Sequence, residues 1–401
     1  MRVFNPTLAL MCAAAMHAVP TSAAPPQQED DAYTRYELLA PATHKFRIVY
    51  DVTATTPGAT HYFNPIRPGS VASDEHVTDR ASDRPLNFAE VDADVARAGG
   101  VVNAQSGTRY IAVTLARPVP TGGGARIRID KTYEDAKTYR SEGDGIIFDR
   151  SLGIRRNAVV LPAGYRLVSS NVPAQILQQA DGRIAVSFWN STPAPMPVVI
   201  RAAPAGGAVP PSSQSALLSE RASQTRNIVY SLRDPDSHSF DLTHDYTEER
   251  AGVADYVNIV RSGSTVANPS ARDLDTGADL TFETVKGAAI AKYDPRARDL
   301  TPDTMAVVFH VPAVAKGTTR RIRIAETYTD PARYLRVGDE LVWHRSFGRP
   351  ANAVVLPAGW MLTNVSVPAT VSETEEGRTR VDVINPRNDE IDVVITARRR
   401  N

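Results

Sequence analysis

Cysteine is almost absent from this sequence. The 401 residues contain one, Cys12, which lies in a segment expected to be removed from the mature protein. A mature chain without cysteine excludes a disulfide framework, a thiolate nucleophile and a thiolate metal site. An exported chain of this kind must therefore be held folded by its apolar cores.

An excess of charge of one sign is also lacking, as are long hydrophobic runs beyond the N-terminus. Lysine plus arginine and aspartate plus glutamate both number 45. A balanced chain has no overall field to attract a polyanion, so direct binding of nucleic acid is not expected. No later stretch is apolar enough to span a bilayer, so we expect no transmembrane segment in the mature chain.

The N-terminus has the pattern of a secretory signal. Arg2 supplies a positive start, residues 7–16 form a short apolar core, and small residues that suit cleavage follow at Ala23 and Ala24. We therefore predict a signal peptide over residues 1–24, cleaved near Ala23–Ala24. The protein is then secreted or periplasmic.

A long internal repeat organises the rest of the chain. Asn157-Ala-Val-Val-Leu-Pro-Ala-Gly164 returns letter for letter as residues 352–359. Matches continue on both sides of this stretch, which indicates duplication of a whole domain. The predicted organisation is a disordered polar tail over 25–33, repeat 1 over 34–203, an Ala/Pro/Ser-rich linker over 204–226, and repeat 2 over 227–401.

Both copies consist of short apolar runs separated by turn residues. Arg-Ile-Arg-Ile at 126–129 and 321–324 alternates strictly, so we expect the isoleucines to face the core and the arginines to face outward. Pro-Ala-Gly at 162–164 and 357–359 predicts a corner between two strands. With about seven to nine runs per copy and no amphipathic helix, the sequence predicts an all-β fold of two tandem homologous antiparallel β-sandwich domains of immunoglobulin-like type.

Polar residues shared by both copies are the first candidates for a functional site. One hypothesis is a carboxylate–arginine–serine site with Ser151 as nucleophile, but no shared histidine in this block can act as its base. The structural alternative, which we favour, pairs each arginine with a carboxylate of its own copy and lets the asparagine cap a turn. The set is Asp135, Asp144, Arg150 and Asn157, with Asp330, Asp339, Arg345 and Asn352 as the second copy.

Acidic and histidine residues gather in two places. Residues 234–245 contain four aspartates and two histidines, and residues 74–79 form a smaller cluster. Neither has the spacing of an established zinc or calcium loop. Solvated loop charge is therefore the preferred interpretation, and no catalytic residue, metal or other cofactor is predicted.

Two aromatic residues, Tyr165 and Trp360, follow the matching Pro-Ala-Gly corners. A pair of exposed rings could stack on a carbohydrate and form two equivalent binding platforms. Large rings beside a corner also commonly close the end of a sandwich. Both interpretations remain open at this point.

Leu-Pro-Ala-Gly followed by an aromatic residue, at 161–165 and 356–360, resembles a strand–corner–strand of noncatalytic β-domains in gluzincin-type zinc aminopeptidases. The whole chain also resembles uncharacterised secreted bacterial tandem β-sandwich proteins. His-Glu-x-x-His is missing, and with it the zinc site and the general base of such a peptidase. The resemblance therefore implies the accessory domain without the peptidase.

Together these features predict a noncatalytic binding or scaffolding protein of the bacterial envelope or extracellular space, with an unknown protein or glycan partner there. The alternative is a hydrolase or a carbohydrate-binding protein with its site in the cleft between the two repeats. Symmetry bears on the choice. An enzyme should have one copy's polar cluster perturbed and lining a pocket, whereas repeated binding modules should keep equivalent clusters in equivalent places.

Overall fold

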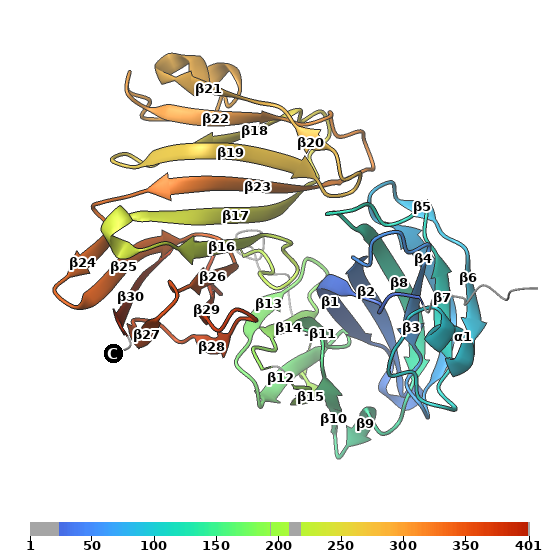
Figure 1. Ribbon diagram of the computed structural model, residues 1–401. Coiled ribbons are helices and arrows are strands. Elements are labelled where there is room, and N and C mark those ends of the chain that lie inside the picture. Colours follow the sequence, from blue (N-terminus) through green and yellow to red (C-terminus); the bar gives the residue numbers. More distant parts are fainter. Residues whose placement is uncertain (1–23, 193, 208–217, 400–401) are drawn as a thin grey trace, which may run out of the picture.

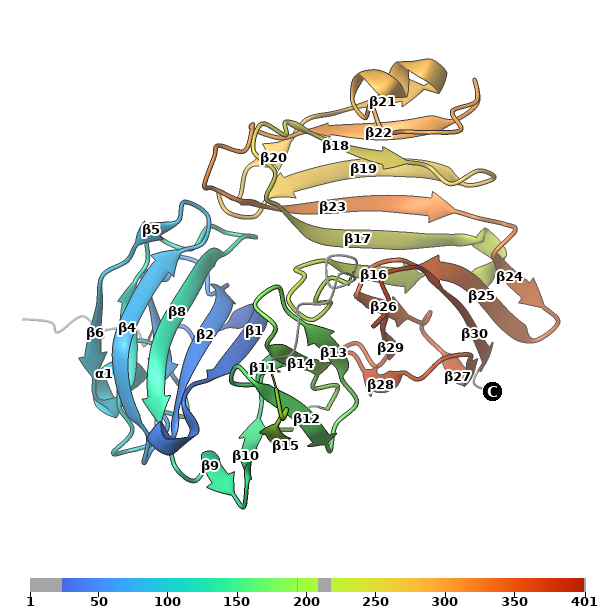
Figure 2. The ribbon, with the colours of Figure 1, turned by 180° about the vertical axis from the view of Figure 1, so that it is seen from behind.

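The computed structural model describes residues 24–192, 194–207 and 218–399, and it shows an all-β protein in two halves of matching topology. The predicted fold class is confirmed. Repeat 1, coloured blue to green, lies beside repeat 2, coloured yellow to red, in both views (Figure 1, Figure 2). The predicted signal peptide falls outside the described residues, except for Ala24.

Repeat 1 contains fifteen strands in its described part: β1 (Glu29–Leu38), β2 (Lys45–Ala54), β3 (His61–Pro65), β4 (Val71–Asp79), β5 (Arg84–Pro85), β6 (Phe88–Val91), β7 (Tyr110–Thr114), β8 (Ala125–Glu134), β9 (Tyr139–Glu142), β10 (Gly145–Leu152), β11 (Arg156–Val160), β12 (Tyr165–Ser170), β13 (Gln175–Gln178), β14 (Ile184–Trp189) and β15 (Met196–Pro204). One short helix, α1 (Ala93–Ala98), begins at Asp92, whose side chain accepts hydrogen bonds from two backbone N–H groups of the first turn.

Repeat 2 contains the matching fifteen: β16 (Asn227–Leu232), β17 (Ser239–Glu248), β18 (Asp255–Ile259), β19 (Thr265–Asp273), β20 (Asp279–Leu280), β21 (Phe282–Lys286), β22 (Met305–His310), β23 (Arg320–Thr329), β24 (Tyr334–Val337), β25 (Glu340–Phe347), β26 (Ala351–Val355), β27 (Trp360–Val365), β28 (Thr370–Glu373), β29 (Thr379–Ile384) and β30 (Ile391–Arg399). Short 3-10 helices lie at Pro41–Thr43, Pro235–Ser237 and Gly287–Lys292.

Each repeat folds into one large and two smaller sheets. The eight-stranded sheet β13-β14-β11-β1-β2-β8-β4-β5 has the same order as β28-β29-β26-β16-β17-β23-β19-β20. The four-stranded sheet β12-β15-β10-β9 corresponds to β27-β30-β25-β24, and the three-stranded sheet β3-β7-β6 to β18-β22-β21. Because strand order is preserved throughout, the duplication read from the sequence covers the entire topology.

The strand count exceeds the seven to nine expected for each copy. The apolar runs were identified, but polar strands such as β4, with the sequence Val-Ala-Ser-Asp-Glu-His-Val-Thr-Asp, were missed. One pairing is also unexpected, because β1 runs parallel to β11 and antiparallel to β2, as β16 does to β26 and β17. The predicted corners are present, and Gly164 and Gly359 adopt φ values of +77° and +78° that favour glycine.

Two segments expected to be irregular make ordered contacts. The tail predicted over residues 25–33 was expected to be disordered, but β1 begins at Glu29 and Asp31 is buried. The described end of the predicted linker packs on both repeats. Glu220 accepts a hydrogen bond from Tyr33 of repeat 1 (2.6 Å), and buried Arg221 donates to the backbone oxygen of Gly348 in repeat 2 (2.8 Å).

The cores lie between the sheets of each repeat. Repeat 1 has one extended core that includes Phe46, Phe148 and Phe188, and repeat 2 has a comparable core around Trp343. Within the described ranges, no helix is long and apolar enough to cross a membrane.

Candidate functional site

Each arginine of the repeated polar set lies in a cage of three aromatic rings. The guanidinium carbon of Arg150 lies 5.6 to 5.8 Å from the ring centres of Tyr36, Phe46 and Tyr133. Arg345 is 5.1 to 5.4 Å from the corresponding rings, which are Tyr230, Phe240 and Tyr328. These cation–π contacts stabilise a charge that the core would otherwise disfavour.

The carboxylates predicted to pair with these arginines lie near them in the same repeat. Asp135 is 3.9 Å from Arg150, and Asp330 is 3.8 Å from Arg345. Burial acts to raise the pKa of Asp135, but hydrogen bonds from Thr138 and Lys137 outweigh it and the pKa is lowered. The arrangement that we favoured from the sequence, an internal arginine–carboxylate contact, is the one observed for these four residues.

The remaining members of the set lie elsewhere. Asp144 and Asp339 are exposed in the turns that precede β10 and β25, and neither pairs with the arginine of its repeat. Asn157 donates to the backbone oxygen of Ile154 (2.6 Å), and Asn352 donates to that of Arg349 (2.9 Å). Both asparagines therefore tie a turn to the strand that follows it.

A cavity of about 620 Å³ lies beside the Arg150 cage in repeat 1. It reaches solvent past exposed residues of two loops, among them Arg67, Asn103 and Gln105. Aromatic and aliphatic side chains form much of its wall, and a few polar groups converge on it. The lining residues central to the following argument are Glu29, Tyr36, Tyr50, Tyr62, Asn64, Lys131, Tyr133 and Arg150.

Lys131 is the unusual residue of this cavity. It lies on β8 between the inward-facing Ile129 and Tyr133 and is only 3 % exposed. Its ammonium donates to Asn64 Oδ1 (2.7 Å) and lies 5.0 Å from the Tyr133 ring centre. Burial lowers the pKa of Lys131 to about 8, against the attraction of Glu75 and with a further lowering by Arg150.

A second polar group of the cavity centres on Glu29 at the start of β1. Its carboxylate accepts hydrogen bonds from the hydroxyls of Tyr62 and Tyr50, and the two hydroxyls are 3.2 Å apart. Burial, together with the negative charge of Glu29, raises the pKa of both tyrosines. These hydroxyls therefore stay protonated and act as donors.

Repeat 2 has the same arrangement of residues at the equivalent position, but with an acid in place of the lysine. Glu326 takes the place of Lys131, and it accepts a hydrogen bond from Asn258, the counterpart of Asn64. Asn258 also donates to Tyr328 (2.9 Å). Burial raises the pKa of Glu326 to about 7, although the hydrogen bond from Asn258 opposes the shift. On the neighbouring strand β17, burial and nearby arginines hold the pKa of His244 well below its usual value. The hydroxyl oxygen of Tyr256 lies 3.1 Å from Nδ1 of His244.

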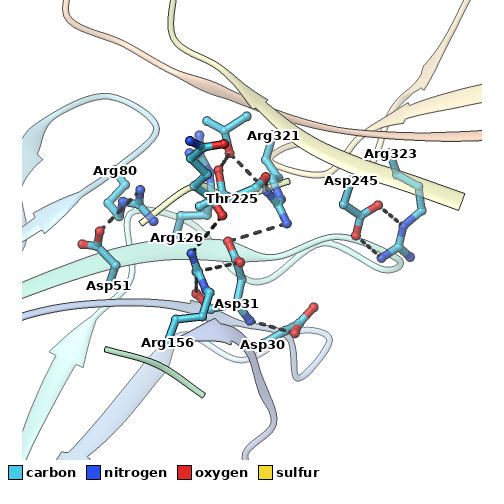
Figure 3. A network of polar contacts seen from close by, with 12 residues as sticks. Asp30, Asp31, Asp51, Arg80, Arg126, Arg156, Thr225, Asp245, Arg321 and Arg323 are labelled. Atoms are coloured by element: carbon cyan, nitrogen blue, oxygen red, sulfur yellow. Dashed lines mark hydrogen bonds and ion pairs between the residues drawn. The ribbon is translucent and has the colours of Figure 1, made fainter. Parts of the chain in front are cut away.

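The cleft between the repeats is crossed by buried ion pairs (Figure 3). Arg126 of repeat 1 donates two hydrogen bonds to the carboxylate of Asp275 in repeat 2, at 2.6 and 2.8 Å. Arg126 and Arg321, which the sequence predicts to face outward, are nevertheless only 2 to 3 % exposed. They do point away from the core of their own repeat, but the other repeat covers them.

Asp31 is the second centre of this interface. Figure 3 shows its carboxylate between Arg156 and Arg321. Arg156 donates to Asp31 Oδ1 at 2.7 Å, and Arg321 of the other repeat lies 3.6 Å from Oδ2. The backbones of the two repeats also touch here. The N–H of Gly124 donates to the backbone oxygen of Leu274 (2.8 Å), and a side chain on Gly123 would collide with the same oxygen.

A smaller cavity of about 290 Å³ lies in this cleft. Its charged lining is largely engaged in ion pairs, which include Arg126 with Asp275 and Arg323 with Asp245. No histidine, serine, cysteine or lysine is among its described lining residues. The described lining of the cleft is therefore dominated by charges that are already paired.

The other sequence-derived candidates contribute no convergent site. Trp360 is buried in the core of repeat 2, and Tyr165 is half-buried against the core of repeat 1, so the two rings do not project as platforms. In the part of the chain that the structure describes, no three histidine, cysteine, aspartate or glutamate side chains gather as a metal site.

Lys131 and Glu326 were not singled out from the sequence, although a signal exists. The alternation that places Ile127, Ile129 and Tyr133 inward also places Lys131 inward. The same alternation places Glu326 inward in repeat 2. A charge at an inward position of a strand, repeated in both copies with opposite sign, marks a buried functional or structural group.

No protein-family model matches the chain, and no curated protein does either. Among solved structures, an M1 zinc metallopeptidase from Deinococcus radiodurans is 11% identical, with a TM-score of 0.29, over 43% of this chain and 41% of its own. A provisionally assigned protease from Parabacteroides distasonis is 11% identical, with a TM-score of 0.24, over 92% of each chain.

A collagen adhesin from Staphylococcus aureus is 9% identical over 79% of this chain and 83% of its own, with a TM-score of 0.16. The match to the Deinococcus radiodurans metallopeptidase covers about two fifths of the length of that enzyme. The Leu-Pro-Ala-Gly corner led us to expect a resemblance to zinc aminopeptidases, and such enzymes are among the similar structures. That the corner itself is a shared motif is not shown. Similarity of this degree assigns no activity to this chain.

Proposed function

We propose that the protein is an exported, noncatalytic binding protein of the bacterial envelope or extracellular space, and that the cavity of repeat 1 is its ligand site. The observation that supports this role is the cavity itself, whose volume of about 620 Å³ lies in the range of small-molecule sites. It combines an apolar and aromatic wall with a few converging polar groups, as such sites do.

The symmetry of the two repeats is broken at this site, which was the behaviour expected of an enzyme. A single ligand site breaks symmetry in the same way, so the choice depends on the chemistry of the lining. The cavity has no histidine, serine or cysteine among its described lining residues. Lys131 alone, with its ammonium bonded to Asn64, supplies a cation and not a nucleophile–base pair. The lining therefore favours binding over hydrolysis.

Closing the mouth of the cavity should abolish binding. Gln105 lines the cavity from an exposed loop, so Gln105→Trp fills the entrance without disturbing the core. Thermal shifts with a panel of monosaccharides, free amino acids and organic acids should show a saturable stabilisation of the wild-type protein that this variant loses.

Val102→Trp is the matched control, because Val102 is exposed in the same loop and lies outside the lining. It should bind as the wild type does. If no compound of any class stabilises the wild-type protein, or if both tryptophan variants bind equally well, the cavity is not a ligand site.

Export is tested at the N-terminus. Leu10 lies in the apolar run of the proposed signal, and Leu10→Arg places a charge there. We expect the wild-type chain, expressed in a Gram-negative host, to leave the cytoplasm and to begin near Ala24 by mass spectrometry of the intact protein. The variant should stay cytoplasmic and uncleaved, and an uncleaved wild-type chain would refute the signal peptide.

A further inference from the structure

Two cations with few partners, Lys131 and Arg150, line the cavity of repeat 1. Lys131 forms no ion pair with a carboxylate in the described ranges, and its ammonium, which has three donors, uses one on Asn64. Arg150 has a single carboxylate contact, at 3.9 Å from Asp135, and its buried Nη1 has no hydrogen-bond partner. Both cations lie within 6 Å of the centre of the Tyr133 ring.

Such an arrangement is costly in an empty cavity. A buried ammonium without a counter-ion loses its hydration, and a second cation nearby adds repulsion. Two charged side chains act on Lys131, Glu75 from β4 and Arg150 from β10, and the uncharged ring of Tyr133 on β8 lies beside it. Glu75 attracts the ammonium, but no ion pair between the two is present in the described part of the chain. An anion in the cavity would satisfy both cations at once.

Resting on the proposed function, we propose that the cavity binds a small organic carboxylate, with its anionic group held between Lys131 and Arg150. Because Asp135 partly compensates Arg150, Lys131 and Arg150 together keep about one positive charge, which fits a monoanion. An arginine fork and an ammonium together match the geometry of a carboxylate.

The remainder of the wall defines the rest of the ligand. It is formed by aromatic and aliphatic side chains, with the protonated hydroxyls of Tyr50 and Tyr62 already directed at Glu29. A second acidic group on the ligand would be repelled by Glu29. The ligand is therefore an acid with an apolar body, such as a medium-chain or aromatic monocarboxylate. The apolar part of the wall includes Ile48, Phe63, Ile66, Tyr110 and Ile154.

Repeat 2 offers the natural counterexample. Its equivalent of Lys131 is Glu326, an acid that lies within hydrogen-bonding reach of Asn258 and that would repel a carboxylate. The two repeats share the asparagine and the arginine caged by three rings, and the opposite charge at this position distinguishes an anion site from one that excludes anions. The chain should therefore bind one carboxylate, in repeat 1.

The test compares acids with their neutral amides. Decanoate and indole-3-acetate, with decanamide and indole-3-acetamide, are titrated into the full chain by calorimetry at pH 7. We expect one acid per chain and at least 10-fold weaker binding of the amides. Lys131→Met should weaken acid binding at least 10-fold without lowering the melting temperature. Lys137→Met, an exposed lysine on the following turn that lies outside the cavity, should have no effect.

The pH profile supplies a readout that a purely structural role would not change. Acid affinity should fall as the pH rises above about 8, where the ammonium of Lys131 loses its proton, and Lys131→Met should flatten the profile. Equal binding of acids and amides, unchanged affinity in Lys131→Met, or two acids per chain would overturn the carboxylate site. If a neutral compound binds and Gln105→Trp blocks it, the binding role stands and the anion assignment falls. Binding of no compound at all refutes both.

Discussion

Arg126→Met should lower the free energy of unfolding by about 3–5 kcal/mol, because it leaves the carboxylate of Asp275 buried without its charge partner. The guanidinium of Arg126 is almost fully buried and makes a bidentate contact with Asp275 across the interface. It also donates to Thr319 of repeat 2. Urea denaturation at pH 7 measures the loss, and the repeats should become less strongly coupled.

Two variants show whether the loss comes from the orphaned charge. Asp275→Asn removes that charge but keeps an oxygen to accept the N–H of Arg321, so the double variant should recover part of the stability. Arg128→Met is the matched control on the same strand. Its partner Asp51 keeps a second cation, Arg80, at 3.5 Å, so the cost should be about 1 kcal/mol.

A loss below about 1 kcal/mol in Arg126→Met would mean that the pair across the interface contributes little to joining the repeats. The other contacts between the repeats, such as Asp31 with Arg321 and the backbone contacts at Gly123 and Gly124, would then carry the interface. The double-mutant cycle separates the two cases, because no rescue is possible where no charge was orphaned.

The sequence predicts those features of the fold that depend on local pattern. Ile127 and Ile129 alternate with arginines, and that pattern predicts β8 and the face it buries. Pro-Ala-Gly predicts the corner before β12, because glycine tolerates the positive φ that Gly164 adopts. The exact repetition of Asn157 to Gly164 predicts that both halves share one topology. These are properties of a few neighbouring residues.

Features that depend on contacts between distant segments could not be predicted. Arg126 is outward-facing in its own repeat, and only the position of repeat 2 makes it buried. β4 is polar along most of its length because only a few of its side chains are buried and its outer side is covered only at Thr78 and Asp79, by the two-residue β5. The cavity depends on how the three-stranded sheet of repeat 1 and the loop at residues 101–109 lie over the large sheet. No single segment carries that information.

The buried acid of repeat 2 leads to the second large effect, a stability that depends on pH. Glu326→Gln should raise the free energy of unfolding by about 2 kcal/mol at pH 8 and should lower it by about 1 kcal/mol at pH 4. Burial raises the pKa of Glu326 from 4.5 to about 7 in the folded chain, so the folded state holds a proton that the unfolded state has released between these values.

The sign follows from that difference. Below pH 4.5 the carboxyl is protonated in both states and imposes no penalty. As the pH rises to 7 the stability falls, and above pH 7 the full penalty of about 3 kcal/mol is present. Glutamine carries no charge and therefore avoids this penalty. Its amide nitrogen, at the position of Oε1, has no hydrogen-bond partner in the structure, which costs about 1 kcal/mol.

Glu248→Gln is the matched variant of opposite sign. Burial acts to raise the pKa of Glu248, but hydrogen bonds and the charge of Arg250 outweigh it and lower the pKa to about 2. This carboxylate therefore stabilises the fold above pH 4.5, and its contribution is lost as the pH falls toward 2. Removing it should destabilise the protein at pH 8.

Guanidinium chloride denaturation of the three proteins between pH 4 and pH 9 decides the matter. The comparison at each pH also removes the contribution of His244, whose lowered pKa makes the fold less stable as the pH drops below 6.5. If Glu326→Gln gains no more at pH 8 than at pH 4, the carboxyl at this position is not held in a desolvated site. The charge inversion between the repeats would then have no consequence for stability, and Lys131 would remain to be judged by ligand binding alone.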